Sequence, residues 1–267
     1  MLKFISFGSG SSGNCYLLKS DNTTIMLDSG VGVRTLKKYF HDYGLSLADV
    51  RAVLVTHDHA DHVKSVGVVS NTVGIPVYAT SKVHAGIQKN YCVRKKVSQE
   101  NIKTIEKEET FQVGDFSVTA FDVPHDSNDN VGYRIEYAGI VFSLMTDVGH
   151  ITDTLRDNIS NSNYLVMESN HDTSMLANGP YPCYLKQRIS GGTGHLDNVT
   201  CANTLCECYT PALKHVWLCH LSEENNHPEL VRKTMETVFQ EHGLKIGVDI
   251  QVDILKRKLP TGFFDLA

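Results

Sequence analysis

A run of histidine and aspartate residues directly after a buried strand constrains this chain more than any other feature. Five of the seven residues in Thr56-His57-Asp58-His59-Ala60-Asp61-His62 can ligate a metal ion, and the apolar segment 51–55 before them has the pattern of a buried strand. So many imidazoles and carboxylates in one loop would repel or desolvate one another without a cation. The donor set suits Zn, Mn or Fe. Because α/β proteins build their sites at the carboxyl ends of strands, the run predicts a metal site on an α/β fold.

The composition is that of a folded protein rather than a disordered or fibrous one. The 267 residues are 41% hydrophobic and 21% charged, which is enough to bury a large core. No apolar run approaches the roughly 18 residues of a membrane helix, and the first residues lack the apolar stretch of a signal peptide. Seven cysteines, an odd number, favour free thiols in a reducing compartment. We therefore expect a cytoplasmic protein without a membrane partner.

Short strands and helices alternate along the chain, with no repeat and no linker. Strands are predicted at residues 2–7, 14–18, 24–27, 51–55, 76–79, 102–123 (with a turn at 113–115), 132–137, 140–144, 164–167 and 215–218. Helices are predicted at residues 33–43, 63–73, 82–91, 195–208 and 229–242. Strands in the middle, with strand–helix units on both flanks, predict two packed sheets covered by helices.

Further motifs follow the histidine run in a fixed order. The run itself matches the HxHxDH signature of the metallo-β-lactamase superfamily. Four other segments resemble the remaining motifs of that superfamily, each after a predicted strand, and they carry Asp28, His125, Asp147 and His220. The resemblance covers nearly the whole chain. It implies one domain over residues 1–267, with the four-layer αββα sandwich and a metal site at one edge between the sheets.

The resemblance also implies which residues hold two divalent ions, Zn or Mn. One ion would be held by His57, His59 and His125. The second would be held by Asp61, His62 and His220, with Asp147 bridging both. Asp28 would orient a ligand by hydrogen bonding. Two cations about 3.5–4 Å apart lower the pKa of a shared water, and Asp61 beside that water would steer or accept its proton, which makes it a catalytic candidate.

Three segments outside the metal motifs bear on the substrate. The loop 8–14 is rich in Gly and Ser and is either a backbone cradle for phosphate or a tight turn between strands. It lacks the lysine of an NTPase loop. Its candidate substrate-binding residues are Ser9, Ser11, Ser12 and Asn14. Segment 167–172 carries Glu168 and His171, a further candidate for substrate binding. Segment 190–198 is a Gly-rich loop that opens the predicted helix 195–208, so His195 would lie at an anion-binding helix start.

Together these segments resemble the YycJ (WalJ)-type branch of the superfamily. That resemblance implies a metal-dependent phosphodiesterase or nuclease, namely a 5′-to-3′ exonuclease on DNA ends that uses a hydroxide bridging two metal ions. By analogy with RNase Z-like enzymes, Glu168 would orient His195, and His195 would contact the scissile phosphate or protonate the leaving oxygen. Asp197 departs from the pattern, because a Ser is expected there.

The net charge of −5 is unusual for a protein that binds nucleic acid. Bound metal ions would add positive charge locally. Three basic segments are candidate contacts for nucleic acid or are simply solvated faces: 82–96, 186–188 and 256–258. If nucleic acid binds at the first of these, we expect that mutating Lys95 and Lys96 together lowers the affinity and flattens its salt dependence.

Other functions share the same metal motifs and stay open at this point. A glyoxalase-II-like thioesterase or a lactamase-like amide hydrolase would not need the pair formed by Glu168 and His195. A small-molecule phosphodiesterase of the cyclic-phosphate type would need the metal site but no DNA surface. A redox scaffold of the flavo-diiron type is disfavoured because the metal set is rich in histidine. Cys201, Cys206 and Cys208 are spaced unfavourably for a second metal site and are interpreted as small buried hydrophobes.

Overall fold

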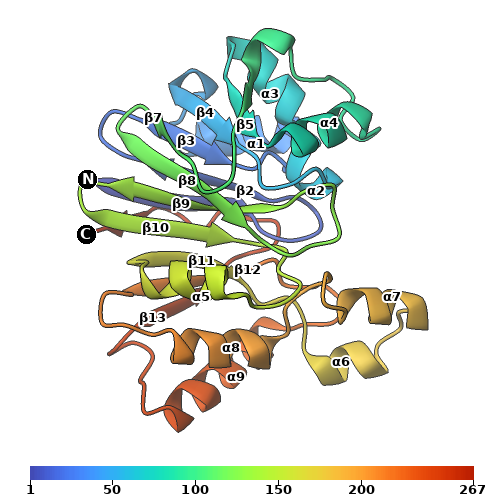
Figure 1. Cartoon of the computed structure of the whole chain (residues 1–267), viewed down its shortest axis with the longest axis vertical. Coiled ribbons are helices and arrows are strands. Elements are labelled where there is room, and N and C mark those ends of the chain that lie inside the picture. Colours follow the sequence, from blue (N-terminus) through green and yellow to red (C-terminus); the bar gives the residue numbers. More distant parts are fainter.

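Two mixed β-sheets stacked face to face form the centre of the molecule, and helices cover both outer faces (Figure 1). The computed structural model describes residues 1–267. The first sheet has the strand order β14-β1-β2-β3-β4-β5-β6, and the second has the order β13-β12-β11-β10-β9-β8-β7. The predicted α/β class and four-layer αββα architecture are confirmed.

The strands of both sheets are short. In the first sheet they are β1 Leu2–Gly8, β2 Cys15–Lys19, β3 Thr24–Leu27, β4 Val50–Leu54, β5 Val77–Ala79, β6 Ile102–Thr104 and β14 Phe264–Leu266. In the second sheet they are β7 Thr110–Val113, β8 Phe116–Asp122, β9 Val131–Tyr137, β10 Ile140–Met145, β11 Tyr164–Glu168, β12 His215–Cys219 and β13 Gln251–Ile254.

Each sheet has its own helical layer. The helices beside the first sheet are α1 Val33–Asp42, α2 Ala60–Val63, α3 Val66–Val73 and α4 Ser81–Lys89. Those beside the second are α5 Asp153–Ser160, α6 Thr173–Asn178, α7 Cys183–Ile189, α8 Asn198–Glu207 and α9 Pro228–Glu241, and two short 3₁₀ turns lie at Leu47–Asp49 and Gln99–Asn101. None of the helices combines the length and the apolar character needed to cross a bilayer.

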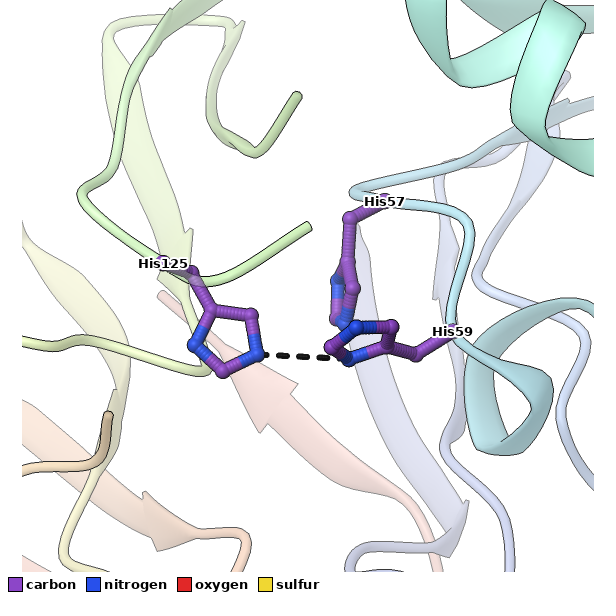
Figure 2. Close-up of side chains that lie close together, drawn as sticks. All are labelled: His57, His59 and His125. Carbon is purple, nitrogen blue, oxygen red and sulfur yellow. Dashed lines mark hydrogen bonds between the residues drawn. The ribbon is translucent and has the colours of Figure 1, made fainter. Parts of the chain in front are cut away.

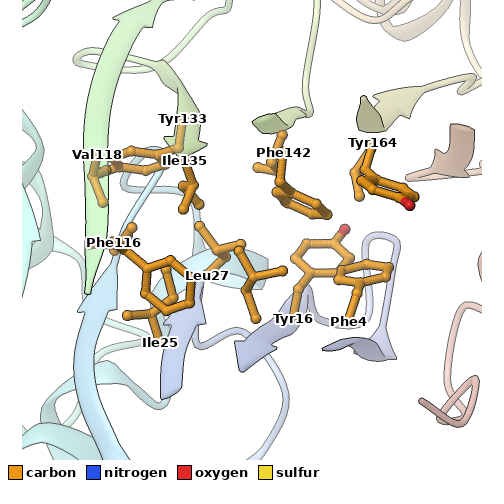
Figure 3. Packing of buried hydrophobic residues seen from close by; sticks show 14 of the residues in the cluster. Phe4, Tyr16, Ile25, Leu27, Phe116, Val118, Tyr133, Ile135, Phe142 and Tyr164 are labelled. Atoms are coloured by element: carbon orange, nitrogen blue, oxygen red, sulfur yellow. The ribbon is translucent and has the colours of Figure 1, made fainter. Parts of the chain in front are cut away.

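Three apolar clusters hold the four layers together. The central cluster lies between the sheets, and in Figure 3 Phe142 and Tyr164 of the second sheet face Phe4 and Tyr16 of the first. The other two clusters lie between each sheet and its helices. Strands therefore bury both faces. In β1, Phe4 enters the central cluster and its neighbour Ile5 packs under the helices, because successive side chains of a strand point to opposite faces.

The direction of the strands determines at which edge of the sandwich the loops that follow them lie. In the first sheet β3 runs parallel to β4, and in the second β10, β11 and β12 run parallel to one another. β8 and β10 are both antiparallel to β9 and therefore point the same way. The carboxyl ends of these strands meet at one edge of the sandwich. The two chain termini lie at the opposite edge, where β1 pairs with β14 (Figure 1).

Most strands and helices expected from the sequence are confirmed within one or two residues. The hairpin of β9 and β10 turns at Ala138 and Gly139, both with positive φ, as a two-residue hairpin requires. The cysteine interpretation is confirmed for Cys201 and Cys208, which are buried in the cluster beneath the second sheet, whereas Cys206 is only partly buried where it packs against that cluster.

Three expected elements differ from the structure. Segment 102–123 is not one strand region with a turn: β6 pairs with β5 in the first sheet, and the chain then crosses to β7 and β8 in the second. The helix expected at 63–73 is two helices, and α2 begins within the histidine run itself. The helix expected at 195–208 begins only at Asn198, because Asp197 caps it by accepting hydrogen bonds from the amides of Val199 and Thr200. The sequence patterns do not predict helices α5 to α7 or the edge strands β13 and β14.

The central cluster generates a stability prediction. Phe4 has no exposed surface, and its ring lies 4.7 Å from that of Trp217 and 5.2 Å from that of Phe142. We expect Phe4→Ala to lower the free energy of unfolding by about 3–5 kcal/mol, because it leaves a cavity between two rigid sheets. Chemical denaturation measures this loss. Leu259→Ala, at an exposed site, is the control and should change stability by no more than about 0.5 kcal/mol. A loss below about 1 kcal/mol for Phe4→Ala would contradict a tightly packed interface.

Candidate active site

Loops from both sheets bring the predicted metal-binding residues to the common edge. Asp28 follows β3, the histidine run follows β4, and His125 follows β8. Asp147 follows β10 and His220 follows β12. All of these strands end at the same edge, so residues almost two hundred positions apart in sequence meet there. The geometry follows from strand direction and not from any local interaction.

Three of these residues have a left-handed backbone. Asp28, Asp147 and His220 have φ values of 58°, 57° and 54°. A residue other than glycine held in this conformation costs about 1–3 kcal/mol. Each turns the chain sharply at the end of its strand, which directs its side chain into the edge between the sheets. Such strain persists only where surrounding packing enforces it, and it clusters at functional sites.

His57, His59 and His125 form the first histidine cluster (Figure 2). The Nε2 of His125 lies 3.3 Å from the Nδ1 of His59. Because the Nδ1 of His125 lies 3.0 Å from the carbonyl oxygen of Gly194, it must carry the proton, which leaves the Nε2 lone pair directed at the cluster. The Nε2 of His57 is buried and has no hydrogen-bond partner. Burial lowers the pKa of both His57 and His125, and neutral imidazoles are the form that binds metals.

Asp61, His62 and His220 form a second cluster beside the first. The Oδ2 of Asp61 lies 3.3 Å from the Nε2 of His220 and 3.6 Å from that of His62. Asp147 lies between the clusters: its Oδ2 is 3.1 Å from the Nε2 of His62, and its Oδ1 is 3.7 Å from the Nε2 of His125. Its Oδ1 also lies 3.5 Å from the Nδ1 of His220, so the carboxylate lies close to both clusters.

Carboxylates on the outer side of the histidines fix the orientation of the imidazole rings. The Nδ1 of His62 donates to Asp28 at 2.7 Å, and Asp28 also accepts from the amide of Thr56 at 2.9 Å. Burial alone would lower the pKa of His62, but Asp147, Asp28 and Asp61 raise it to about 10. This surplus of negative charge favours a cation that would displace the proton.

The carboxylate of Glu168 forms hydrogen bonds both with the second cluster and with the Gly-rich segment 190–198. Its Oε1 accepts from the Nδ1 of His195 at 2.9 Å and from the Nδ1 of His220 at 3.0 Å. Its Oε2 accepts from the amides of Val148 and Leu196. Burial alone would raise the pKa of Glu168, but the charge of His195 and the hydrogen bonds lower it to about 2. The carboxylate thus stays ionised and ties three loops together.

His195 lies at the opening of the site and not on a helix. Its ring is 18% exposed, and its Nδ1 lies 3.7 Å from Asp147. The expected anion site at the start of a helix is wrong, because the carboxylate of Asp197 already occupies the first amides of α8. His195 and the buried His171 line a hollow of about 440 Å³ together with Thr173. The Nδ1 of His171 has no hydrogen-bond partner.

The Gly- and Ser-rich loop is a packed turn. Four of its amides are used within the protein: those of Ser9, Gly10, Gly13 and Asn14. The Oγ of Ser9 accepts from the amide of His220 at 2.9 Å. The Nδ2 of Asn14 lies 2.8 Å from the Nε2 of His62 and 3.3 Å from the Oδ2 of Asp61.

Burial separates the four residues of this loop that were predicted to bind substrate. Ser9 and Asn14 have no exposed surface, whereas Ser11 and Ser12 are exposed. Direct contact with a substrate therefore stays a prediction for the two exposed serines, while Ser9 and Asn14 contact candidate ligands. Gly30 packs against this loop without room for a side chain, since a Cβ there would lie 1.6 Å from the carbonyl oxygen of Asp61.

Sequence reasoning did not identify two polar residues that support the site. The hydroxyl of Thr56 donates to Asp28 at 3.0 Å. The Nδ2 of Asn170 donates to the carbonyl oxygen of His220 at 2.8 Å. Thr56 could have been suspected from its place directly before His57. Asn170 has no such signal, because its partner is 50 positions away.

Several residues of the predicted basic segments have structural roles. The ammonium group of Lys96 donates to the carbonyl oxygens of Ile87 and Asn90. The guanidinium of Arg257 donates to the carbonyl oxygens of Leu221 and Asn226. Arg188 pairs with Asp126, and Lys258 pairs with Glu223. In the segment around α4, the exposed basic residues without an ion pair are Lys82, Lys89, Arg94 and Lys95.

The chain resembles known proteins over almost its whole length. A model described as "Beta-lactamase superfamily domain" matches residues 23–220. Exodeoxyribonuclease YycJ of Bacillus anthracis is 33% identical over 260 residues, which is 97% of each chain. Exodeoxyribonuclease WalJ of Streptococcus pneumoniae is 32% identical over 94% of this chain and 93% of its own.

Two solved structures share the fold at low identity. The metallo-β-lactamase fold protein YhfI from Bacillus subtilis has a TM-score of 0.70 at 18% identity, covering 97% of this chain and 99% of its own. Zn(2+)-bound PqqB from Methylobacterium extorquens has a TM-score of 0.72 at 16% identity, covering 99% of this chain and 100% of its own. With the family match and the near full-length relatives, these similarities confirm the resemblance: the chain belongs to the metallo-β-lactamase superfamily, in the family of the YycJ and WalJ proteins.

Proposed function

We propose that this protein is a metal-dependent exodeoxyribonuclease that hydrolyses phosphodiester bonds at DNA ends in the 5′-to-3′ direction. The observation that carries the proposal is the pair formed by Glu168 and His195 at the opening of the histidine clusters, with 2.9 Å between Oε1 and Nδ1. A hydrolase that only needs an activated water has no use for this additional, oriented histidine. The near full-length similarity to proteins named exodeoxyribonuclease supports the same substrate class.

The family implies divalent metal ions, and the donor atoms fit them. We propose two ions, one held by His57, His59 and His125 and the other by Asp61, His62 and His220, with Asp147 contacting both. The unpartnered Nε2 of His57 and the position of the Asp147 carboxylate close to both clusters support this assignment. Such a pair of ions lowers the pKa of a shared water and stabilises charge on phosphate oxygens. The imidazoles suit Zn, and the carboxylates of the second site also suit Mn.

Asp61 and His195 are the proposed proton-handling residues. Asp61 is 22% exposed, so its carboxylate can accept a hydrogen bond from the attacking water. The Nδ1 of His195 is held by Glu168, which leaves its Nε2 free to contact the scissile phosphate or to protonate the leaving oxygen. Glu168 is a positioning residue, since it is fully buried and reaches substrate only through His195.

The remaining candidates divide into two groups. We propose that Ser11, Ser12 and His171 contact the DNA, because the two serines are exposed and His171 lines the hollow beside His195. Ser9 and Asn14 instead position His220, His62 and Asp61 through their hydrogen bonds.

The first test is cleavage of a 5′-phosphorylated, end-labelled DNA duplex in the presence of Mn or Zn. We expect stepwise release of mononucleotides by the wild type and none by Asp61→Ala, which lacks a proposed ligand and proton acceptor. Hydrolysis of bis(p-nitrophenyl) phosphate without DNA cleavage would move the substrate to a small phosphodiester. Inactivity on both substrates would favour the thioesterase alternative.

A second prediction separates His195 from the metal site. We expect His195→Ala to lower kcat for DNA cleavage by about 10²–10⁴-fold, the usual contribution of a positioned acid, with the metal content unchanged by elemental analysis. Glu168→Gln should lower both kcat and metal affinity, because Glu168 also holds His220. Full activity of His195→Ala would remove the residue from the mechanism and favour a hydrolase without a general acid.

A third prediction concerns the Gly- and Ser-rich loop. We expect Asn14→Ala to weaken metal binding by about 10–100-fold, as loss of a residue that orients ligands does, measured by competition with a chelating dye. Ser12→Ala, on the exposed side of the same loop, is the matched control and should bind metal normally. Normal metal affinity together with a raised KM for DNA in Asn14→Ala would instead mean that Asn14 contacts the substrate.

A further inference from the structure

A hollow of about 470 Å³ opens beside both clusters, and its outer wall has no role described so far. One wall carries His59 and Asp61, and the other is the end of α4 and the turn after it, with Lys89 and Tyr91. We call this hollow the α4 pocket. Its volume lies within the range of small-molecule sites in proteins, and it opens directly onto two proposed metal ligands.

The wall formed by α4 is fixed firmly against the histidine run. Gly86 touches Asp58 so closely that a Cβ would lie 2.0 Å from its Oδ2. The Nδ2 of Asn90 donates to the carbonyl oxygen of Asp58 at 2.7 Å. The turn itself is held by the amide of Cys92, which donates to the side chain of Asn90, and by Lys96. The backbone around Tyr91 is therefore anchored on both sides.

Tyr91 itself has no partner. Its side chain is 92% exposed, more than that of any other large apolar residue. It makes none of the ring contacts that occupy other aromatic residues of the chain. An exposed ring on an anchored turn, directed at no protein group, is suited to stacking against a flat ligand.

The charges around the α4 pocket favour a phosphate-bearing ligand. Lys89 is exposed and has no ion pair, whereas Arg188, which also lines the pocket, pairs with Asp126. The carboxylate of Asp58 is buried at the base and accepts hydrogen bonds from Asn128, so it presents little free negative charge. A cation, an aromatic ring and adjacent metal ligands match the phosphate, the base and the reacting bond of a nucleotide.

We propose that the α4 pocket binds the nucleotide next to the scissile phosphate, with its base stacked on Tyr91 and a flanking phosphate contacted by Lys89. The inference rests on the proposed nuclease function and specifies how the site holds its substrate. Stacking on an aromatic ring tolerates every base, which an exonuclease needs because it must process any sequence.

The experiment pairs variants of Tyr91 with abasic substrates. Single-stranded DNA is prepared with a tetrahydrofuran residue in place of the first, second or third nucleotide, and kcat/KM is measured for each. With intact DNA we expect Tyr91→Ala to lower kcat/KM by about 5- to 100-fold, the effect of losing one stacked base. Tyr91→Phe should keep wild-type activity, and Tyr91→Leu should behave like Tyr91→Ala.

The decisive result is the coupling between protein and substrate changes. One abasic position should lower wild-type kcat/KM by the same factor as Tyr91→Ala, and Tyr91→Ala should show no further loss there. Tyr184→Ala, at an exposed tyrosine on α7 outside the pocket, should retain wild-type sensitivity. If the wild type cleaves DNA but no abasic position is coupled to Tyr91, the stacking role is overturned and the proposed function is not. Equal activity of Tyr91→Leu and Tyr91→Phe would have the same meaning. Failure of the wild type to cleave any DNA overturns the proposed function as well.

Discussion

The carboxylate of Asp147 is the group on which the arrangement of the site depends. Its two oxygens lie within 4 Å of ring nitrogens from His62, His125, His195 and His220. These histidines come from four segments that are far apart in sequence, His62 from α2 and the other three from loops, so one carboxylate contacts both clusters and the proposed general acid. The left-handed backbone of Asp147 places it there directly after β10, and β10 is hydrogen-bonded on both sides, to the parallel strand β11 and the antiparallel strand β9.

Two further carboxylates support different halves of the site, and only one of them also contacts His195. Asp28 supports only the first sheet's contribution, through His62 and Thr56. Glu168 supports the second sheet's contribution and also reaches His195. The proposed metal binding and the proposed proton donation would therefore be linked through a single buried residue, because Glu168 contacts both His220 and His195. The strain at Asp28, Asp147 and His220 is maintained by the packed layers behind them.

The acidic character of the whole chain is compatible with a nucleic-acid substrate once the structure is considered. Many basic side chains are engaged in holding loops, as Lys96 and Arg257 are, so counting charges along the chain overstates the available cationic surface. The unpaired positive charge near the proposed metal centre is limited to Lys89, which lies beside Tyr91 at the α4 pocket. Binding would then depend on metal ions, one or two cations and stacking rather than on a broad basic face.

The sequence by itself determined the kinds of donor atoms, the strands that precede them and the family. These features are local: a histidine run after an apolar segment predicts a site at the end of a strand, and a glycine after a helix predicts where the helix ends, and each pattern spans only a few residues. Only the tertiary structure decided that segment 102–123 divides between two sheets and that Asp197 caps α8 and leaves His195 in a loop. It also decided that Ser9 and Asn14 face inward, toward the candidate ligands His220 and His62. Each of these depends on which distant backbone or side chain lies opposite, and no local pattern specifies that partner.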